Sequence, residues 1–137
     1  MLRALTATAG VLAAALATAS PATSTSVAAE SLTGTWKGTL TQQDMPKFTV
    51  TATIRTLDRS STKNPVFYGA PLHCKGHWRF LDREGSVYRF RETITSGHSS
   101  SCKGTGTVKL TWKGGDRARY RFSGGGVTSG GTLKRTG

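Results

Sequence analysis

Few side chains in this chain of 137 residues have the type and spacing that covalent chemistry requires. Glu92 alternates with Tyr88 and Phe90, so we expect all three on the inward face of one strand. No second inward carboxylate is expected, and glycoside hydrolysis by paired carboxylates therefore has no support. Segment 97–101 (GHSSS) begins like a nucleophile elbow but lacks the closing glycine and a following helix. We therefore expect no enzymatic activity.

Glu92 needs a partner, because burying an unpaired charge among apolar side chains costs several kcal/mol. One interpretation is structural: Arg135, a tyrosine hydroxyl or backbone N–H groups satisfy the carboxylate. The other makes Glu92 the polar anchor of a ligand pocket, or a general acid with a raised pKa. We favour the structural interpretation and keep the second open.

The histidines are poorly spaced for a metal ion. His73 and His77 share the outward face of a predicted strand and lie about 13 Å apart, too far for both to bind one ion directly. His98 falls in a predicted loop between strands. We expect neither a metal site nor a cofactor.

The first 29 residues are typical of a secretory signal peptide. Arg3 precedes the small apolar stretch 10–17, and a sequence rich in Ala, Ser and Thr follows. Small residues permit cleavage after Ala19 or Ala29, and we favour Ala29. Residues 30–137 have the length of one domain, which we expect to be extracellular.

Two cysteines, Cys74 and Cys102, remain in the predicted mature chain, and an even count in an exported protein indicates one disulfide. A closed loop of about 29 residues would stabilise the fold by roughly 3.6 kcal/mol. The alternative is a thiol nucleophile with His73 or His77 as its base, which oxidising surroundings disfavour.

Apolar and polar residues alternate with a period of two throughout the mature chain, which predicts β-strands. Clusters of Gly, Pro, Asp and Ser between the alternating segments predict turns. About eight short antiparallel strands can close on themselves, so we predict an all-β, up-and-down barrel. A β-sandwich is the alternative, since Pro71 leaves open whether residues 65–82 form one strand or two. The alternating segments are 33–42, 47–55, 66–70, 74–82, 86–95, 104–113, 119–122 and 132–135.

The cysteines fit this meander. Strands 74–82 and 104–113 both flank strand 86–95 and begin at the same rim, where Cys74 and Cys102 meet. Two ladder spacings, about 9–10 Å, are too long for a disulfide without a bend. Gly76, Gly104 and Gly106 are candidates to supply it.

Two resemblances follow from short motifs. Gly34-Thr35-Trp36 with Arg135 resembles the pairing in lipocalin-like and avidin-like barrels, where an Arg packs over the Trp and closes the barrel base. A longer set of residues is similar to small exported domains of actinobacteria, some of which form the outer portion of membrane serine/threonine kinases. This resemblance implies a fold and an extracellular location. The family has no established reaction, so the resemblance implies no mechanism. The set comprises Tyr68, Cys74-Lys75-Gly76, segment 90–97 (FRETITSG), Cys102 and segment 106–110 (GTVKL).

The predicted inward face carries many bulky apolar groups. Eight strands leave room either for these side chains or for one small ligand, and the crowding favours a packed core. The alternative is a hydrophobic pocket at the open rim. Its candidate residues are Trp78, Glu92, Trp112 and Tyr120.

Charge is the distinctive feature of the predicted outward face. The chain has 19 Lys and Arg against 7 Asp and Glu. The predicted signal peptide contains only Arg3 among these, which leaves the mature chain with a net charge of +11. Cationic surfaces attract polyanions, but outward aromatic residues for base stacking are nearly absent, so we expect no sequence-specific nucleic-acid binding. We call seven outward cations the basic face: Arg79, Arg89, Arg91, Lys109, Lys113, Arg119 and Arg121.

The sequence therefore predicts a secreted, monomeric, non-catalytic binding protein. The leading hypothesis is association of the basic face with anionic polymers, lipid headgroups or cell-envelope surfaces. One alternative is binding of a small hydrophobic ligand in the barrel mouth. Another is inhibition of a secreted protease through loop 96–101 or 57–65.

Overall fold

The computed structural model describes residue 17, residues 31–98 and residues 102–137. The predicted signal peptide, apart from Ala17, lies outside the described residues, as do residues 99–101. Within the described part of the chain, no helix is long and apolar enough to cross a membrane.

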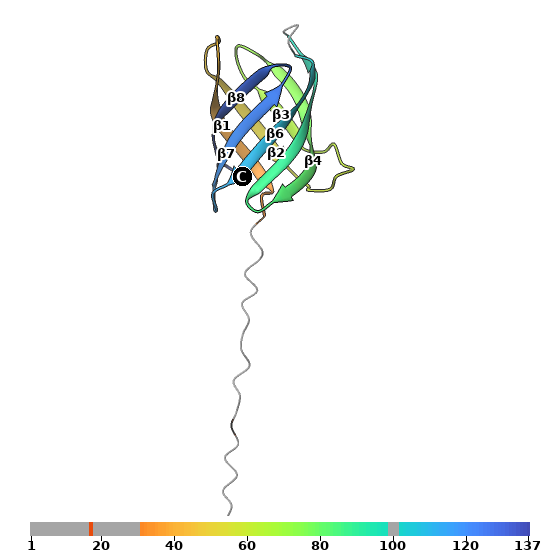
Figure 1. Cartoon of the computed structure of the whole chain (residues 1–137), viewed down its shortest axis with the longest axis vertical. Coiled ribbons are helices and arrows are strands. Elements are labelled where there is room, and N and C mark those ends of the chain that lie inside the picture. Colours follow the sequence, from red (N-terminus) through yellow and green to blue (C-terminus); the bar gives the residue numbers. More distant parts are fainter. Residues whose placement is uncertain (1–16, 18–30, 99–101) are drawn as a thin grey trace, which may run out of the picture.

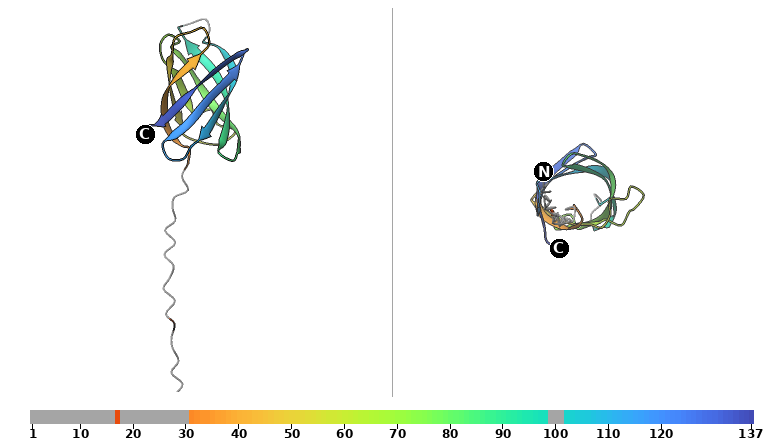
Figure 2. Two further views of the ribbon diagram at one scale, coloured as in Figure 1. Left: turned by 60° about the vertical axis from the view of Figure 1, so that its left-hand side comes forward. Right: turned by 90° about the horizontal axis from the view of Figure 1, so that it is seen from below.

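Eight strands form one closed antiparallel barrel, in which each strand pairs with the next in sequence and the last pairs with the first (Figures 1 and 2). The predicted all-β, up-and-down barrel is confirmed, and the sandwich alternative is wrong because no open edge separates two sheets. Residues 65–82 contribute to two strands on either side of Pro71. The strands are β1 (Gly34–Gln42), β2 (Phe48–Ile54), β3 (Pro65–Tyr68), β4 (Cys74–Glu84), β5 (Val87–Gly97), β6 (Gly104–Trp112), β7 (Arg117–Gly124) and β8 (Val127–Arg135).

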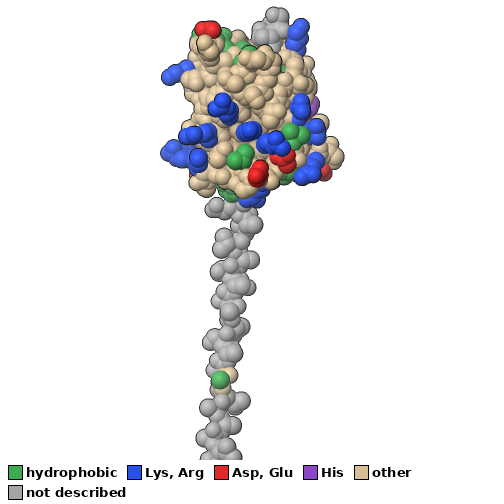
Figure 3. All heavy atoms as spheres, in the orientation of Figure 1, with side chains coloured by type: hydrophobic (Ala, Val, Ile, Leu, Met, Phe, Trp, Pro, Cys, Tyr) green, Lys and Arg blue, Asp and Glu red, His purple; other side chains and the backbone are tan. Residues whose placement is uncertain are grey.

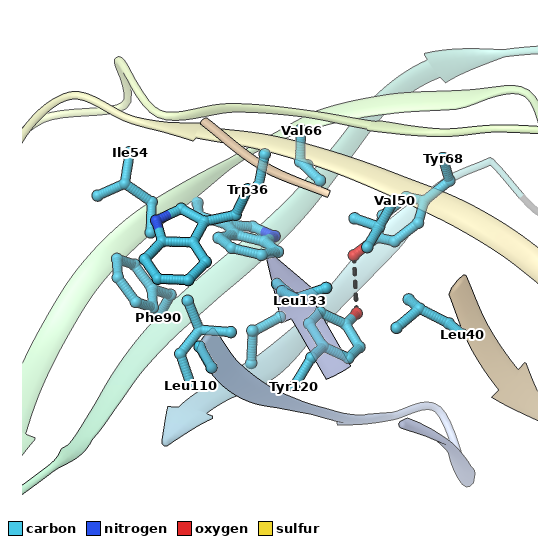
Figure 4. Packing of buried hydrophobic residues seen from close by; sticks show 14 of the residues in the cluster. Trp36, Leu40, Val50, Ile54, Val66, Tyr68, Phe90, Leu110, Tyr120 and Leu133 are labelled. Atoms are coloured by element: carbon cyan, nitrogen blue, oxygen red, sulfur yellow. Dashed lines mark hydrogen bonds between the residues drawn. The ribbon is translucent and has the colours of Figure 1, made fainter. Parts of the chain in front are cut away.

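The period of two separates the barrel interior from its surface. Even-numbered residues point inward in β1 to β7, except after the register shift between Phe80 and Asp82, where Asp82 pairs with the outward Arg89. Trp36 and Phe90 are among the largest fully buried side chains (Figure 4), and so is Trp78. The Trp78 ring lies 5.6 Å from that of Phe90 and 6.0 Å from that of Tyr120, centroid to centroid. Removal of this apolar surface from water is the main favourable term in folding. The alternation therefore predicted which face the buried apolar residues occupy, and the register shift after Phe80 is a departure from it.

One end of the barrel, where β1 begins and β8 ends, is filled, and we call it the closed end. Trp36 Nε1 donates a hydrogen bond to the Leu32 carbonyl at 2.8 Å. The Arg135 guanidinium lies over the Trp36 ring, 4.7 Å from its centroid, and donates to the carbonyls of Ser31 and Thr33. Arg135 and Trp36 thus join the last strand to the first through an aromatic contact of the cation–π type.

A disulfide joins Cys74 to Cys102 at the opposite, open end, with Cα atoms 5.1 Å apart, and confirms the predicted bridge. Cys102 reaches Cys74 by lying over Gly97, which pairs with Cys74 across the ladder. A Cβ atom at Gly97 would lie only 2.3 Å from Cys102 Sγ, so only glycine leaves room for the crossing. Among the three glycines predicted to bend the chain, Gly76 lies at a register shift between β4 and β5. The role of Gly97 was not predicted.

The segment between β2 and β3 protrudes from the barrel wall and includes the predicted inhibitory loop 57–65 (Figure 1). Asn64 is buried at its base. Its Oδ1 accepts hydrogen bonds from the backbone N–H groups of Arg55 and Thr56. Its Nδ2 donates to the carbonyls of Thr56 and Trp78. This side chain fixes the loop to the barrel, while protease inhibition stays a prediction.

Candidate functional site

The open end contains a cavity of about 480 Å³ that reaches into the barrel. Strands from around the barrel contribute its walls, so no single sequence segment outlines it. Most of the lining is apolar or aromatic, with one carboxylate at the inner end. Side chains that define it are Phe48, Tyr68, Glu92, Ile94, Tyr120 and Phe122.

Glycines keep this half of the barrel hollow although the other half is packed. Gly104, Gly124 and Gly125 line the cavity and add no side chain to it. Gly106 lets the Phe122 ring lie directly on the β6 backbone, since a Cβ atom at Gly106 would be 2.1 Å from a ring carbon. The ring therefore rests against the wall and leaves the centre open. A packed core and a pocket, which the sequence presented as alternatives, occupy different halves of the same barrel.

Glu92 lies at the inner end of the cavity and is 4% exposed. Its Oε1 accepts hydrogen bonds from the Tyr68 hydroxyl and from Trp78 Nε1, the latter at 3.0 Å. The Tyr68 and Tyr120 hydroxyls are 2.8 Å apart and point toward one another (Figure 4). Because the single Tyr68 proton is used on Glu92, Tyr120 must donate to Tyr68. Tyr68 and Trp78 therefore donate to one carboxylate oxygen, and Tyr120 donates to Tyr68 behind it.

The second carboxylate oxygen, Oε2, belongs to a side chain that lines the cavity. No described residue donates a hydrogen bond to Oε2, and Arg135 Nε is the only fully buried, unpartnered side-chain polar atom in the described part of the chain. Oε2 therefore keeps access to the cavity. Arg135, one of the partners that the sequence suggested for Glu92, lies at the closed end instead. The tyrosine hydroxyl was the correct suggestion.

Burial sets the protonation chemistry of this cluster. It raises the pKa of Glu92, and the hydrogen bonds from Tyr68 and Trp78 oppose that change. Burial also raises the pKa of the Tyr68 and Tyr120 hydroxyls, and the neighbouring carboxylate adds to the effect. Both tyrosines therefore stay protonated and remain available as donors at neutral pH.

Glu92→Gln is expected to remove part of the pH dependence of stability. The folded-state pKa of Glu92 lies above its ordinary value of 4.5, so the folded protein holds this proton more tightly than the unfolded chain. The stabilising contribution is complete below pH 4.5 and is lost as the pH rises through the raised pKa. Urea denaturation should therefore show the free energy of unfolding of the wild type falling relative to Glu92→Gln over this range. Parallel pH dependences of the free energy of unfolding for the wild type and Glu92→Gln would contradict the assignment.

The four predicted pocket residues do not all line the cavity. Glu92 and Tyr120 do, whereas Trp78 lies behind Glu92 and reaches it through the indole N–H. Trp112 lies at the closed end, where its Nε1 donates to the Gly115 carbonyl at 3.0 Å and Arg135 lies over its ring. Alternation predicts whether a side chain points inward, but not which end of the barrel it lies at. Trp112 is the last residue of β6, which begins at the open rim, so it lies at the closed end.

Several lining residues were not predicted as part of the pocket. Phe48, Tyr68 and Phe122 were interpreted only as core. Phe48 and Tyr68 stand at the open-end termini of β2 and β3, and Phe122 stands near that of β7, which was the available signal. Gln42 and Ser129 also contribute at the rim, where the Ser129 hydroxyl donates to Gln42 Oε1 at 3.1 Å.

Six cations of the basic face lie on the outer surfaces of β4 to β7, and Lys113 lies in the turn that follows β6. Its cations stand opposite one another in the strand register: Arg89, Lys109 and Arg121 form a row across three strands, and Arg79 pairs with Arg91. Like charges directly opposite are destabilising. On the face drawn in Figure 3, Lys and Arg side chains gather over the half nearest the closed end.

Few acidic groups compensate this charge. Of the seven cations, only Arg89 forms an ion pair within the described residues, with Asp82 of β4. A second row, Lys37, Lys134 and Arg117, crosses β1, β8 and β7 and extends the positive surface. The cations of the basic face are exposed except Arg79, which is half-buried.

Among residues 31–98 and 102–137 there is no group of three His, Cys, Asp or Glu that could hold a metal ion. The disulfide is compatible with an extracellular location. No protein-family model and no curated protein sequence matches the chain.

Proposed function

We propose that this protein binds a small, largely apolar molecule in the open end of its barrel and acts by binding, without covalent chemistry. The observation that carries the proposal is the cavity of about 480 Å³ with the buried Glu92 in its lining. Small-molecule sites are commonly concave, mostly apolar and equipped with a few convergent polar groups. The cavity has each of these properties.

The free-energy cost of burying the Glu92 carboxylate supports a role for this residue in ligand recognition. A buried carboxylate loses its hydration, and an apolar side chain in its place would often stabilise a core. Two direct donors and a tyrosine behind them hold Oε1 in place, while Oε2 accepts no hydrogen bond from a described residue. A purely structural acceptor would have no need for a free oxygen at the wall of an open space.

Titration with the uncharged fluorescent dye N-phenyl-1-naphthylamine tests the proposal. We expect saturable enhancement of dye fluorescence, and at least tenfold weaker binding in Ile94→Trp, because the larger side chain enters the cavity. Thr93→Trp is the matched control, since the same residue is introduced on the outer face of the same strand. Absence of saturable binding to the wild type, or equal loss in both variants, would overturn the proposal.

A second function, association with anionic polymers or lipid headgroups, is favoured by the uncompensated cation rows. Arg89, Lys109 and Arg121 lie directly opposite one another on neighbouring strands, which lowers the stability of the fold. The presence of this destabilising row supports a role in attracting polyanions. We further propose that the chain is secreted as a monomer after removal of residues 1–29. The pattern of the N-terminal segment, the disulfide and the resemblance to exported actinobacterial domains support this address.

A further inference from the structure

We propose that the ligand of the open-end cavity is a small apolar monoamine whose ammonium group binds Glu92 Oε2. The inference rests on the proposed cavity function and deepens it by naming the ligand class. It follows from how the hydrogen-bonding capacity of Glu92 is used, from the lining of the cavity and from the charge at its mouth.

The carboxylate still has unused hydrogen-bonding capacity at Oε2. Oε1 is occupied by the Tyr68 hydroxyl and the Trp78 indole N–H, while Oε2 has no donor among the described residues. A purely apolar ligand would displace water from Oε2 and leave this oxygen without a partner. A carboxylate ligand would meet like charge at the inner end. An ammonium group instead supplies both the missing donor and the opposite charge.

The walls near Glu92 suit a cation. Phe48, Tyr68, Tyr120 and Phe122 line the same cavity, and aromatic faces attract ammonium groups. Farther out, the lining includes Leu72, Val127 and other apolar groups that can contact a hydrocarbon body. The ligand therefore lies with its ammonium inward and its apolar body toward the mouth.

The mouth selects against a second cation. Lys103 lines the outer part of the cavity and is exposed. A diamine with one ammonium at Glu92 would present its other ammonium toward Lys103. Monoamines are therefore preferred over diamines of similar length.

Competition against N-phenyl-1-naphthylamine tests the assignment with three ligands of similar shape: 2-phenylethylamine, 2-phenylethanol and 3-phenylpropionate. In the wild type, the amine should displace the dye at a concentration at least tenfold below that of the alcohol, and the acid should be weakest. In Glu92→Gln, the advantage of the amine over the alcohol should fall below threefold. Asp44→Asn removes the same charge from the exposed turn between β1 and β2, and should preserve the preference.

The outcomes separate the two proposals. Saturable dye binding without a preference for the amine overturns the ligand class and leaves the cavity function in place. Absence of both dye binding and calorimetric heat with 2-phenylethylamine overturns both. The wild-type ranking of the three ligands decides the question even where Glu92→Gln fails to fold. Equal loss of preference in Asp44→Asn would show long-range charge attraction in place of a contact with Glu92, and would also overturn the assignment.

Discussion

Replacing Cys74 and Cys102 together with alanine is expected to lower the free energy of unfolding by about 3.6 kcal/mol. The disulfide closes a loop between residues 28 apart in sequence, and its removal restores conformational freedom to the unfolded chain. Urea denaturation of the oxidised wild type and the double variant measures the difference. A loss of this size corresponds to a change of several hundredfold in the folding equilibrium.

The same variant should also bind the fluorescent dye more weakly. Cys74 lines the cavity, and the bridge ties the segment before β6 to its rim. Ser96→Ala, an exposed change on the neighbouring part of β5, serves as the control and should alter neither property. A double variant as stable as Ser96→Ala would refute the stabilising role assigned to the bridge.

Binding to heparin is expected to weaken about a thousandfold between 50 and 200 mM salt if about six cations contact the polymer, because each contact releases a condensed counterion. Neutralising three neighbouring cations, with Arg91→Gln, Lys109→Gln and Arg121→Gln, should lower the slope of log affinity against log salt by about three. Fluorescence anisotropy with labelled heparin at a series of salt concentrations measures both quantities.

A matched triple variant distinguishes the effect of the basic face on heparin binding from the effect of net charge. Lys47→Gln, Lys63→Gln and Lys75→Gln remove the same charge from exposed positions outside the basic face. We expect them to change the slope much less. An equal effect of the two triple variants, or binding insensitive to salt, would count against a polyanion site at the basic face.

Sequence periodicity predicted the fold well, because burial of one face of each strand leaves a clear alternation of residue types. Trp36, Trp78 and Phe90 were predicted inside from this alternation alone. The predicted count of about eight strands agrees with the structure, in which the turn at Pro71 separates β3 from β4. The crossing of Cys102 over Gly97 was missed, since close backbone approach depends on the three-dimensional path of the loop.

The candidate site was predicted only in part, because position along the barrel axis has no periodic signal. Trp112 and Tyr120 both point inward, yet only Tyr120 lies at the cavity. The donors to Glu92 come from β3 and β4, and their convergence requires the closed register of the barrel. Predicting the basic face requires only knowing which side chains point outward, and alternation along each strand gives this information.

The central claim is that a ligand enters the open end and reaches Glu92, and the three tryptophan indole N–H resonances test it most directly. Each indole has a different acceptor: the Leu32 carbonyl for Trp36, Glu92 for Trp78 and the Gly115 carbonyl for Trp112. In a heteronuclear NMR titration of the wild type with 2-phenylethylamine, we predict a saturable shift of the Trp78 resonance while those of Trp36 and Trp112 stay unchanged. A Trp78 resonance that does not move, or equal movement of all three, would contradict the account.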